Sequence, residues 1–134
     1  MKLSIVIVTY TSAEVISNCL ASIPVGWDSQ NDDRRQTTDD RPPPGVHHPS
    51  SAVETIVVDN GSTDGTVEII QNEFPAVRLF SGPGNLMFAG GNNYGFKQAT
   101  APLIFMLNPD TVVHPSALRK LVDFADAHPE AGMI

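Results

Sequence analysis

The hydrophobic residues of the chain are arranged with two different periods that alternate along its length. Nearly unbroken apolar runs rich in β-branched residues are typical of strands buried on both faces of a parallel sheet. The expected strands lie at residues 3–9, 54–59, 77–80, 103–107 and, as the start of a fifth, 131–134. Between these runs, apolar residues recur at the spacing of a helix face. The expected helices cover residues 12–23, 66–73, 90–99 and the stretch that Pro115 opens, and Pro24 is expected to end the first of them.

Strands that alternate with helices predict an α/β fold of the Rossmann-like kind. The repeated units give a mostly parallel sheet with right-handed crossovers and helices on both faces. In such sheets a ligand binds beyond the carboxyl ends of the strands, where the strand order reverses. The loops after the first, second and fourth strands are therefore expected to form one site.

Residues 25–52 interrupt this pattern and predict a disordered insertion within a single domain that covers residues 1–134. The segment is rich in polar residues and contains three consecutive prolines, Pro42 to Pro44. His47 and His48 lie inside it, and because no other metal-ligand pattern accompanies them, we expect a solvated loop rather than a metal site.

Charge and hydropathy exclude several classes of partner. The formal net charge of -7 opposes binding to nucleic acid or anionic lipid. The apolar start of the chain is far shorter than the roughly 20 residues that span a bilayer. We therefore predict a soluble, cytoplasmic chain without a transmembrane segment, with the inner face of the membrane as a further location. The single cysteine, Cys19, lies among apolar helix positions and is assigned to the core.

The first group of candidate site residues follows the first strand and comprises Thr9, Tyr10 and Glu14. The tyrosine ring can lie against a nucleobase, and backbone N–H groups at the start of a helix can take a phosphate. The simpler interpretation is a helix start capped by Ser12, and this group alone does not decide between the two.

The second group follows the second strand and comprises Asp59, Asn60 and Asp64. An acid at the tip of a buried strand can accept a hydrogen bond from a base or a ribose hydroxyl, and Asp64 can also cap the next helix. A calcium loop is excluded, because Gly61 occupies the third position, where that loop needs Asp or Asn.

The remaining candidates are Asn92, in the glycine-rich run NLMFAGGNNYG, and Asn108 and Asp110 after the fourth strand. Mg²⁺ or Mn²⁺ commonly takes one or two carboxylates and fills its shell with diphosphate oxygens and water, so Asp110 is the predicted metal ligand. The sequence TYTSAE after the first strand lacks the glycines of a dinucleotide fingerprint, which argues against a dehydrogenase. It also lacks the glycine-rich, basic loop expected of a nucleotidyltransferase.

Four segments, in this order, resemble the inverting glycosyltransferases of family 2, which have the GT-A fold. These segments are IVIVTYTSAEVISNCLASI, IVVDNGSTDGT, NLMFAGGNNYG and FMLNPDT, and the last two resemble the rhamnosyltransferase-like subgroup. The resemblance covers the chain apart from residues 25–52, where the family normally has a much shorter connection.

The resemblance implies the transfer of a sugar from a nucleotide-diphospho-sugar donor to a saccharide or lipid-linked acceptor, in cell-wall or polysaccharide synthesis. Thr9, Tyr10, Glu14 and Asp59 would surround the nucleoside, while Asn92 and Asn108 would support the donor. Asp110 would hold the metal on the diphosphate. The catalytic base is expected beyond Ile134, so that the chain would be the donor-binding half of an enzyme. The alternative is a non-catalytic nucleotide-binding or interaction module derived from such an enzyme.

Overall fold

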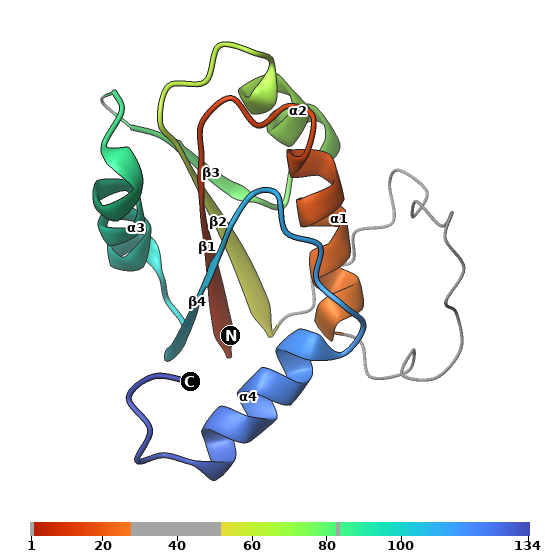
Figure 1. Cartoon of the computed structure of the whole chain (residues 1–134), viewed down its shortest axis with the longest axis vertical. Helices are drawn as coiled ribbons and strands as arrows, with labels where there is room; N and C mark the ends of the chain where they lie inside the picture. The colour runs from red at the N-terminus through yellow and green to blue at the C-terminus, as the bar shows by residue number, and fades with distance from the viewer. Residues whose placement is uncertain (1, 28–51, 83) are drawn as a thin grey trace.

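A four-stranded parallel sheet forms the centre of the protein (Figure 1). The computed structural model describes residues 2–27, 52–82 and 84–134. The strand order is β3-β2-β1-β4, so the chain adds strands on one side of β1 and then crosses to its other side. The strands are β1 (Leu3–Thr9), β2 (Val53–Asp59), β3 (Arg78–Ser81) and β4 (Leu103–Leu107). The predicted α/β fold with a parallel sheet is confirmed.

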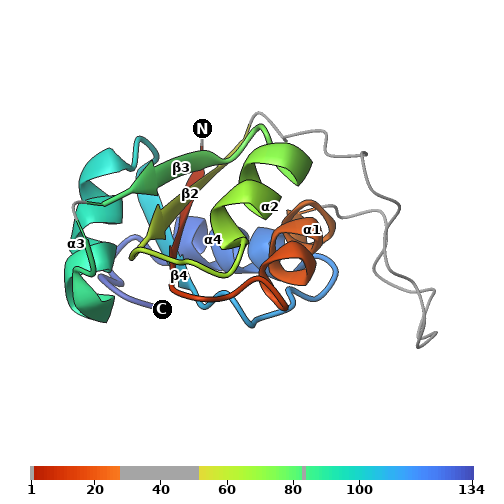
Figure 2. The ribbon, with the colours of Figure 1, turned by 90° about the horizontal axis from the view of Figure 1, so that it is seen from above.

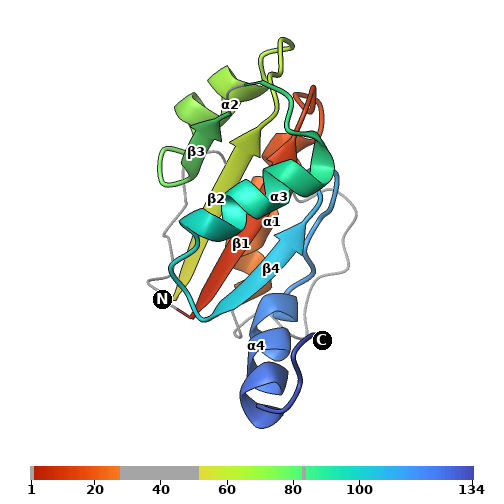
Figure 3. The ribbon, with the colours of Figure 1, turned by 90° about the vertical axis from the view of Figure 1, so that its left-hand side faces the viewer.

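Helices cover both faces of the sheet, as Figures 2 and 3 show. The helices are α1 (Ile16–Trp27), α2 (Thr66–Glu73), α3 (Met87–Gln98) and α4 (Ala117–Ala127). Because side chains alternate along a strand, Ile5 and Ile7 of β1 point into the main core with α1 and α2, whereas Val6 points toward α3. Helix α4 packs beside α1 through Leu118 and Val122. In the described part of the chain, no helix is long and apolar enough to cross a membrane.

Helix α1 does not end at Pro24 as the sequence predicts. It continues to Trp27 with Pro24 inside it. A proline removes one N–H from the helix ladder, and a single lost bond near the end of a helix is a small part of its stability when the apolar face is packed. Leu20 and Ile23, which precede the proline by four residues and by one residue, are both buried in the core.

Other element boundaries also differ from the sequence prediction. Residues 25–27 belong to α1 and not to the insertion, whose residues 28–51 lie outside the described part of the chain. Helix α3 begins at Met87 instead of near Gly90. Residues 131–134 form no strand, so the expected fifth strand is wrong for these residues.

Two glycines allow α3 to lie directly on the sheet. A Cβ atom added at Gly95 would come within 2.4 Å of Val6 Cγ1, and one added at Gly91 would come within 2.7 Å of Val8 Cγ1. Both valines belong to the central strand β1, so neither can move without disturbing its neighbours. The glycine-rich sequence of α3 therefore serves helix-to-sheet packing.

We expect Gly95→Ala to lower the free energy of unfolding by about 1–3 kcal/mol, the usual cost of overpacking. Chemical denaturation of the variant and the wild type would measure the difference. Gly132→Ala is the control, because a Cβ atom at Gly132 would meet nothing within 4 Å. Equal stability of the Gly95 variant and the wild type would contradict the close packing of α3.

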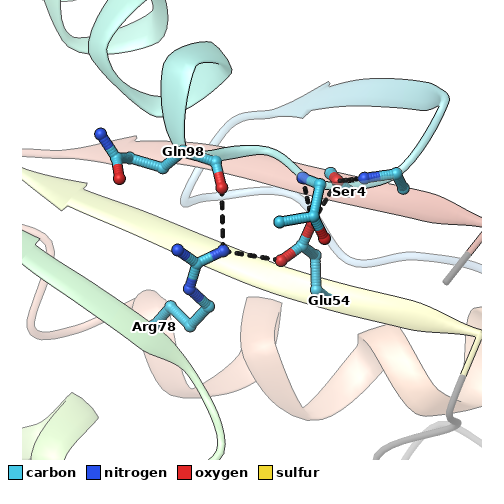
Figure 4. A network of polar contacts seen from close by, with 6 residues as sticks. Ser4, Glu54, Arg78 and Gln98 are labelled. Atoms are coloured by element: carbon cyan, nitrogen blue, oxygen red, sulfur yellow. Dashed lines mark hydrogen bonds and ion pairs between the residues drawn. The ribbon is translucent and has the colours of Figure 1, made fainter.

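A polar network around the buried Glu54 side chain joins the elements at the edge of the sheet where the strands begin (Figure 4). The Glu54 carboxylate, on β2, accepts hydrogen bonds from Ser4 on β1, from Thr100 after α3 and from Arg78 on β3. Arg78 also donates to the Gln98 carbonyl at the end of α3, over 2.8 Å. The Glu54 carboxylate thus links β1, β2 and β3 to each other and to the segment that follows α3.

Candidate functional site

The loops that follow β1, β2 and β4 meet at the carboxyl edge of the sheet (Figure 1). Strand β1 lies between β2 and β4, so the strand order reverses at β1. An open α/β sheet binds its ligand at such a point. All the predicted site residues lie in these loops, at the strand ends, or on α3, whose first residue is also near this edge.

Thr9 and Asp59 lie buried at the carboxyl edge of the sheet. They are register partners at the ends of β1 and β2, and their exposed fractions are 1% and 2%. The Asp59 Oδ2 atom accepts the N–H groups of Gly61 and Ser62, each over 3.0 Å, and Oδ1 accepts the Ser62 hydroxyl. A carboxylate has about four acceptor positions, so Asp59 keeps one, on Oδ1, for a ligand.

The Thr9 hydroxyl is the one buried side-chain polar atom of the described residues that has no hydrogen-bond partner. Buried polar groups in folded proteins are nearly always paired with protein, water or ligand. The unpaired Thr9 hydroxyl is thus a candidate partner for a bound molecule at the ends of β1 and β2.

Tyr10 and Glu14 lie between β1 and α1, and their side chains are exposed. The Tyr10 side chain is 55% exposed, while its carbonyl accepts the hydroxyls of Thr11 and Ser12. The Ser12 hydroxyl therefore does not cap α1 as predicted. Instead, the Ser12 carbonyl accepts the N–H groups of Val15 and Ile16 at the start of that helix.

Three backbone N–H groups before α1, those of Thr11, Ser12 and Ala13, already have side-chain partners and are therefore not available for a phosphate. The Thr11 N–H donates to the Ser62 hydroxyl over 2.9 Å, and the Ser12 N–H donates to the Thr66 hydroxyl over 2.9 Å. The Ala13 N–H donates to the Asp64 carboxylate over 3.0 Å. Side chains of the β2–α2 loop and of the first residue of α2 thus accept hydrogen bonds from three consecutive backbone N–H groups of the β1–α1 loop.

Asp64 is committed to these loop contacts. Besides the Ala13 N–H, its carboxylate accepts the hydroxyl and the N–H of Thr66, the first residue of α2. The N-cap position of α2 is Gly65 and not Asp64, so Asp64 contacts the helix start from one residue before the N-cap position that the sequence predicts for it. The hydrogen bonds from the Thr66 hydroxyl and the Ala13 N–H lower the pKa of Asp64 below its ordinary value. The carboxylate is therefore charged at neutral pH.

Asn60 joins the site to α3. Its side-chain amide donates to the Met87 carbonyl and accepts the Leu86 N–H, both over 3.2 Å. Met87 has a φ of 59°, a left-handed conformation that bulky side chains rarely adopt. Asn92 lies one turn further on and is buried, and its amide donates to the Phe88 carbonyl over 2.9 Å. Donor binding by Asn60 and Asn92 stays a prediction.

Asn108 and Asp110 follow β4 and have exposed side chains. The Asn108 carbonyl accepts the Thr111 N–H and the Cys19 thiol. Burial, and after it the nearby negative charge of Asp110, raises the pKa of Cys19 to about 12, so this core thiol is unreactive at neutral pH. The Asp110 carboxylate forms no hydrogen bond within the described part of the chain, and it is free for a cation.

Ser62 and Thr66 are functional candidates that the sequence did not indicate. Both stand in the turn-rich run after β2, but nothing in that run specifies which distant amides they bind. Their partners are 51 and 54 residues away along the chain. Only the folded arrangement of the two loops reveals them.

A comparison with protein families gives the family of the chain. The family model described as "Glycosyl transferase family 2" matches residues 4–134. The chain belongs to glycosyl transferase family 2. This family assignment confirms the resemblance seen in the sequence.

Two curated glycosyltransferases are similar to parts of the chain. An "Uncharacterized glycosyltransferase" of Haemophilus influenzae is 35% identical over 75 residues, which are 54% of this chain and 30% of that protein. An "N-acetylglucosaminyl-diphospho-decaprenol L-rhamnosyltransferase" of Mycobacterium tuberculosis is 31% identical over 93 residues, 61% of this chain and 30% of the relative. The matched part is thus less than a third of the length of each relative.

Solved glycosyltransferase structures share the fold. S. aureus TarS 1-349 in complex with UDP superposes with a TM-score of 0.73 at 23% identity, covering 96% of this chain and 33% of that chain. The mannosyltransferase PcManGT of Pyrobaculum calidifontis, in complex with GDP-Man and Mn²⁺, gives a TM-score of 0.62 at 22% identity. It covers 81% of this chain and 27% of that chain. Family 2 membership and the GT-A fold are therefore consistent with each other.

Proposed function

We propose that this family 2 chain binds the nucleotide-diphospho-sugar donor of a sugar-transfer reaction at the carboxyl edge of β1, β2 and β4. The observation that carries the proposal is the buried, unpaired Thr9 hydroxyl beside the Asp59 carboxylate. A hydroxyl and a carboxylate acceptor side by side match the donors and acceptors of a base or a ribose. The exposed Tyr10 ring supplies a surface for stacking next to them.

The diphosphate belongs at the Asp110 side of this edge. Among the described residues, no three His, Cys, Asp or Glu side chains lie close enough together to form a metal site by themselves. A lone, accessible carboxylate instead fits Mg²⁺ or Mn²⁺, which takes most of its ligands from diphosphate and water. When bound, such a cation supplies positive charge that stabilises a departing nucleoside diphosphate. Asp110 would hold it there.

The proposed reaction is a single displacement with inversion at the anomeric carbon. The residues of this chain bind and orient the donor. The acceptor is proposed to be a saccharide or a lipid-linked saccharide, and one 31% identical relative is named for a lipid-linked substrate. A general base for the acceptor hydroxyl is part of such a reaction. We assign no described residue to that task.

We expect UDP or GDP to stabilise the chain only when Mg²⁺ or Mn²⁺ is present. A ligand at 100 times its Kd adds about 2.7 kcal/mol to the free energy of unfolding, which raises Tm by several degrees. Thermal unfolding with each nucleotide, with metal or with EDTA, is the measurement. Asp110→Ala is expected to remove the metal-dependent part of the shift and to keep the Tm of the nucleotide-free protein.

Asp123→Ala is the matched control, because Asp123 is an exposed carboxylate on α4, where it pairs with Arg119. This variant should show the wild-type shift. An equal shift with and without metal would contradict the role of Asp110. The absence of any shift with either nucleotide would contradict donor binding by this edge.

A further inference from the structure

The β1–α1 loop is held in its conformation by side chains of the neighbouring β2–α2 loop. The Ser62 hydroxyl, the Asp64 carboxylate and the Thr66 hydroxyl each accept one of three successive backbone N–H groups. We call Ser62, Asp64 and Thr66 the loop clamp. We propose that the loop clamp positions Tyr10 for the nucleotide and sets nucleotide affinity through the β1–α1 loop. This inference rests on the proposed function.

The position of the clamp beside Tyr10 supports this role. Thr11, the residue after Tyr10, has a φ of 49°, and a β-branched residue in this left-handed region is a genuine outlier. Backbone strain persists only where the surrounding structure enforces it. The Ser62 hydroxyl accepts the N–H of this same strained residue. Release of that bond would let Thr11 relax and would move the attachment point of the Tyr10 ring.

The clamp is also connected to the Asp59 carboxylate at the carboxyl edge of the sheet. The Ser62 hydroxyl that accepts the Thr11 N–H donates its own hydrogen to Asp59 Oδ1, the carboxylate oxygen that keeps an acceptor position for the ligand. The Thr66 hydroxyl likewise accepts the Ser12 N–H and donates to Asp64 Oδ1 over 2.6 Å. Each hydroxyl thus uses both of its hydrogen-bonding roles within the protein. The clamp hydroxyls are therefore positioning groups rather than ligand groups.

Thr66 is fully buried, and Ser62 is half-buried. A buried hydroxyl cannot reach a molecule at the surface. In this proposal, Asp64 acts on the β1–α1 loop through its hydrogen bond with the Ala13 amide. Its exposed carboxylate accepts three hydrogen bonds, so a direct contact with the donor, as the sequence predicts, stays a prediction.

The test compares variants that remove a clamp hydroxyl with variants that keep it. Ser62→Ala and Thr66→Val remove the hydroxyl, whereas Ser62→Thr and Thr66→Ser retain it. Thr63→Val is the control in the same loop, because the exposed Thr63 side chain makes no hydrogen bond in the described structure. Isothermal titration with UDP and with GDP, each in the presence of Mg²⁺, gives Kd and stoichiometry. Circular dichroism of each variant at the titration temperature gives its folded fraction. Because reversible unfolding weakens the apparent affinity only by that fraction, a stability loss is recognised separately.

We expect Ser62→Ala and Thr66→Val each to weaken nucleotide binding about fivefold, which corresponds to the loss of one ordinary hydrogen bond. The hydroxyl-retaining variants and Thr63→Val should bind within about twofold of the wild type. Amide hydrogen exchange of the nucleotide-free protein should accelerate about fivefold at Thr11 in the first variant and at Ser12 in the second.

Wild-type affinity in both hydroxyl-removing variants would overturn the clamp while leaving the proposed function intact. An equal loss of affinity in the hydroxyl-retaining variants would also overturn it, because the effect would then follow from packing. If the wild type binds neither nucleotide, the proposed function fails, and the role of the clamp in affinity fails with it.

Discussion

Replacing Glu54 by alanine is expected to lower the free energy of unfolding by about 1.5–3 kcal/mol, the range for losing hydrogen bonds to a charged group. The Glu54 side chain is 5% exposed, and its carboxylate accepts bonds from Ser4, Thr100 and Arg78. Alanine would leave the buried Ser4 hydroxyl without this acceptor, which carries a desolvation cost, whereas the exposed Thr100 and Arg78 groups can bind water instead. Three strands and the end of α3 would lose their shared contact at the amino-terminal edge of the sheet (Figure 4).

The same network makes stability depend on acid pH. Burial by itself would raise the pKa of Glu54, but the hydrogen bonds from Ser4, Thr100 and Arg78 outweigh it and lower the pKa from 4.5 to about 2. Because the folded-state pKa is the lower one, the contribution of Glu54 is complete above pH 4.5 and is lost as the pH falls toward 2. A pKa difference of this size is worth about 3 kcal/mol.

Urea denaturation at a series of pH values between 7 and 2 would measure both effects. Glu54→Gln should be less stable than the wild type at pH 7, and the gap should close as the wild-type carboxylate is protonated. Glu130→Ala is the control, because Glu130 is exposed after α4, and its stability should stay within about 0.5 kcal/mol of the wild type. A gap between Glu54→Gln and the wild type that is constant with pH would contradict the lowered pKa.

The second large effect is expected at Asp59, where Asp59→Asn should weaken UDP or GDP binding by about 10- to 100-fold. Asparagine can keep the loop: its oxygen accepts the N–H groups of Gly61 and Ser62, and its nitrogen donates to the Ser62 hydroxyl. The substitution converts the ligand-facing acceptor of Oδ1 into a donor. A lost hydrogen bond to a charged group costs about 1.5–3 kcal/mol, which gives the expected range.

Isothermal titration and thermal unfolding of Asp59→Asn and Asp59→Ala separate binding from loop structure. The asparagine variant should retain the wild-type Tm and lose affinity. The alanine variant should lose both, because it also removes the acceptor for the Gly61 and Ser62 amides. Wild-type affinity in Asp59→Asn would show that the ligand does not use this carboxylate.

The strands and the chemistry at their ends could be predicted from the sequence because both are local properties. The runs at residues 3–9 and 103–107 match β1 and β4, and the helix at residues 66–73 matches α2. Since all strands are parallel, residues that directly follow them must gather at one edge, and Thr9 and Asp59 are indeed register partners. The buried position of these two residues follows from the same pattern.

The ends of helices and the partners of polar loop residues could not be predicted in this way. A local rule places a helix end at Pro24, but α1 continues because its apolar face packs on the sheet. The sequence places the start of α3 near Gly90, but the helix begins at Met87, and two glycines within it permit close packing against Val8 and Val6. In each case, tertiary contacts outweigh a local preference of a few kcal/mol or less.

The amino-acid sequence by itself thus determined the α/β sheet, the edge at which the candidate site residues gather and the kinds of side chain found there. Only the tertiary structure decided what those side chains do. Ser62, Asp64 and Thr66 bind amides more than 50 residues away, and Asn60 binds the start of α3. The physical reason is that a hydroxyl, amide or carboxylate in a loop can bond to any donor or acceptor within reach. Which one lies within reach is set by the packing of the helices on the sheet, and not by the neighbours of that residue in the sequence.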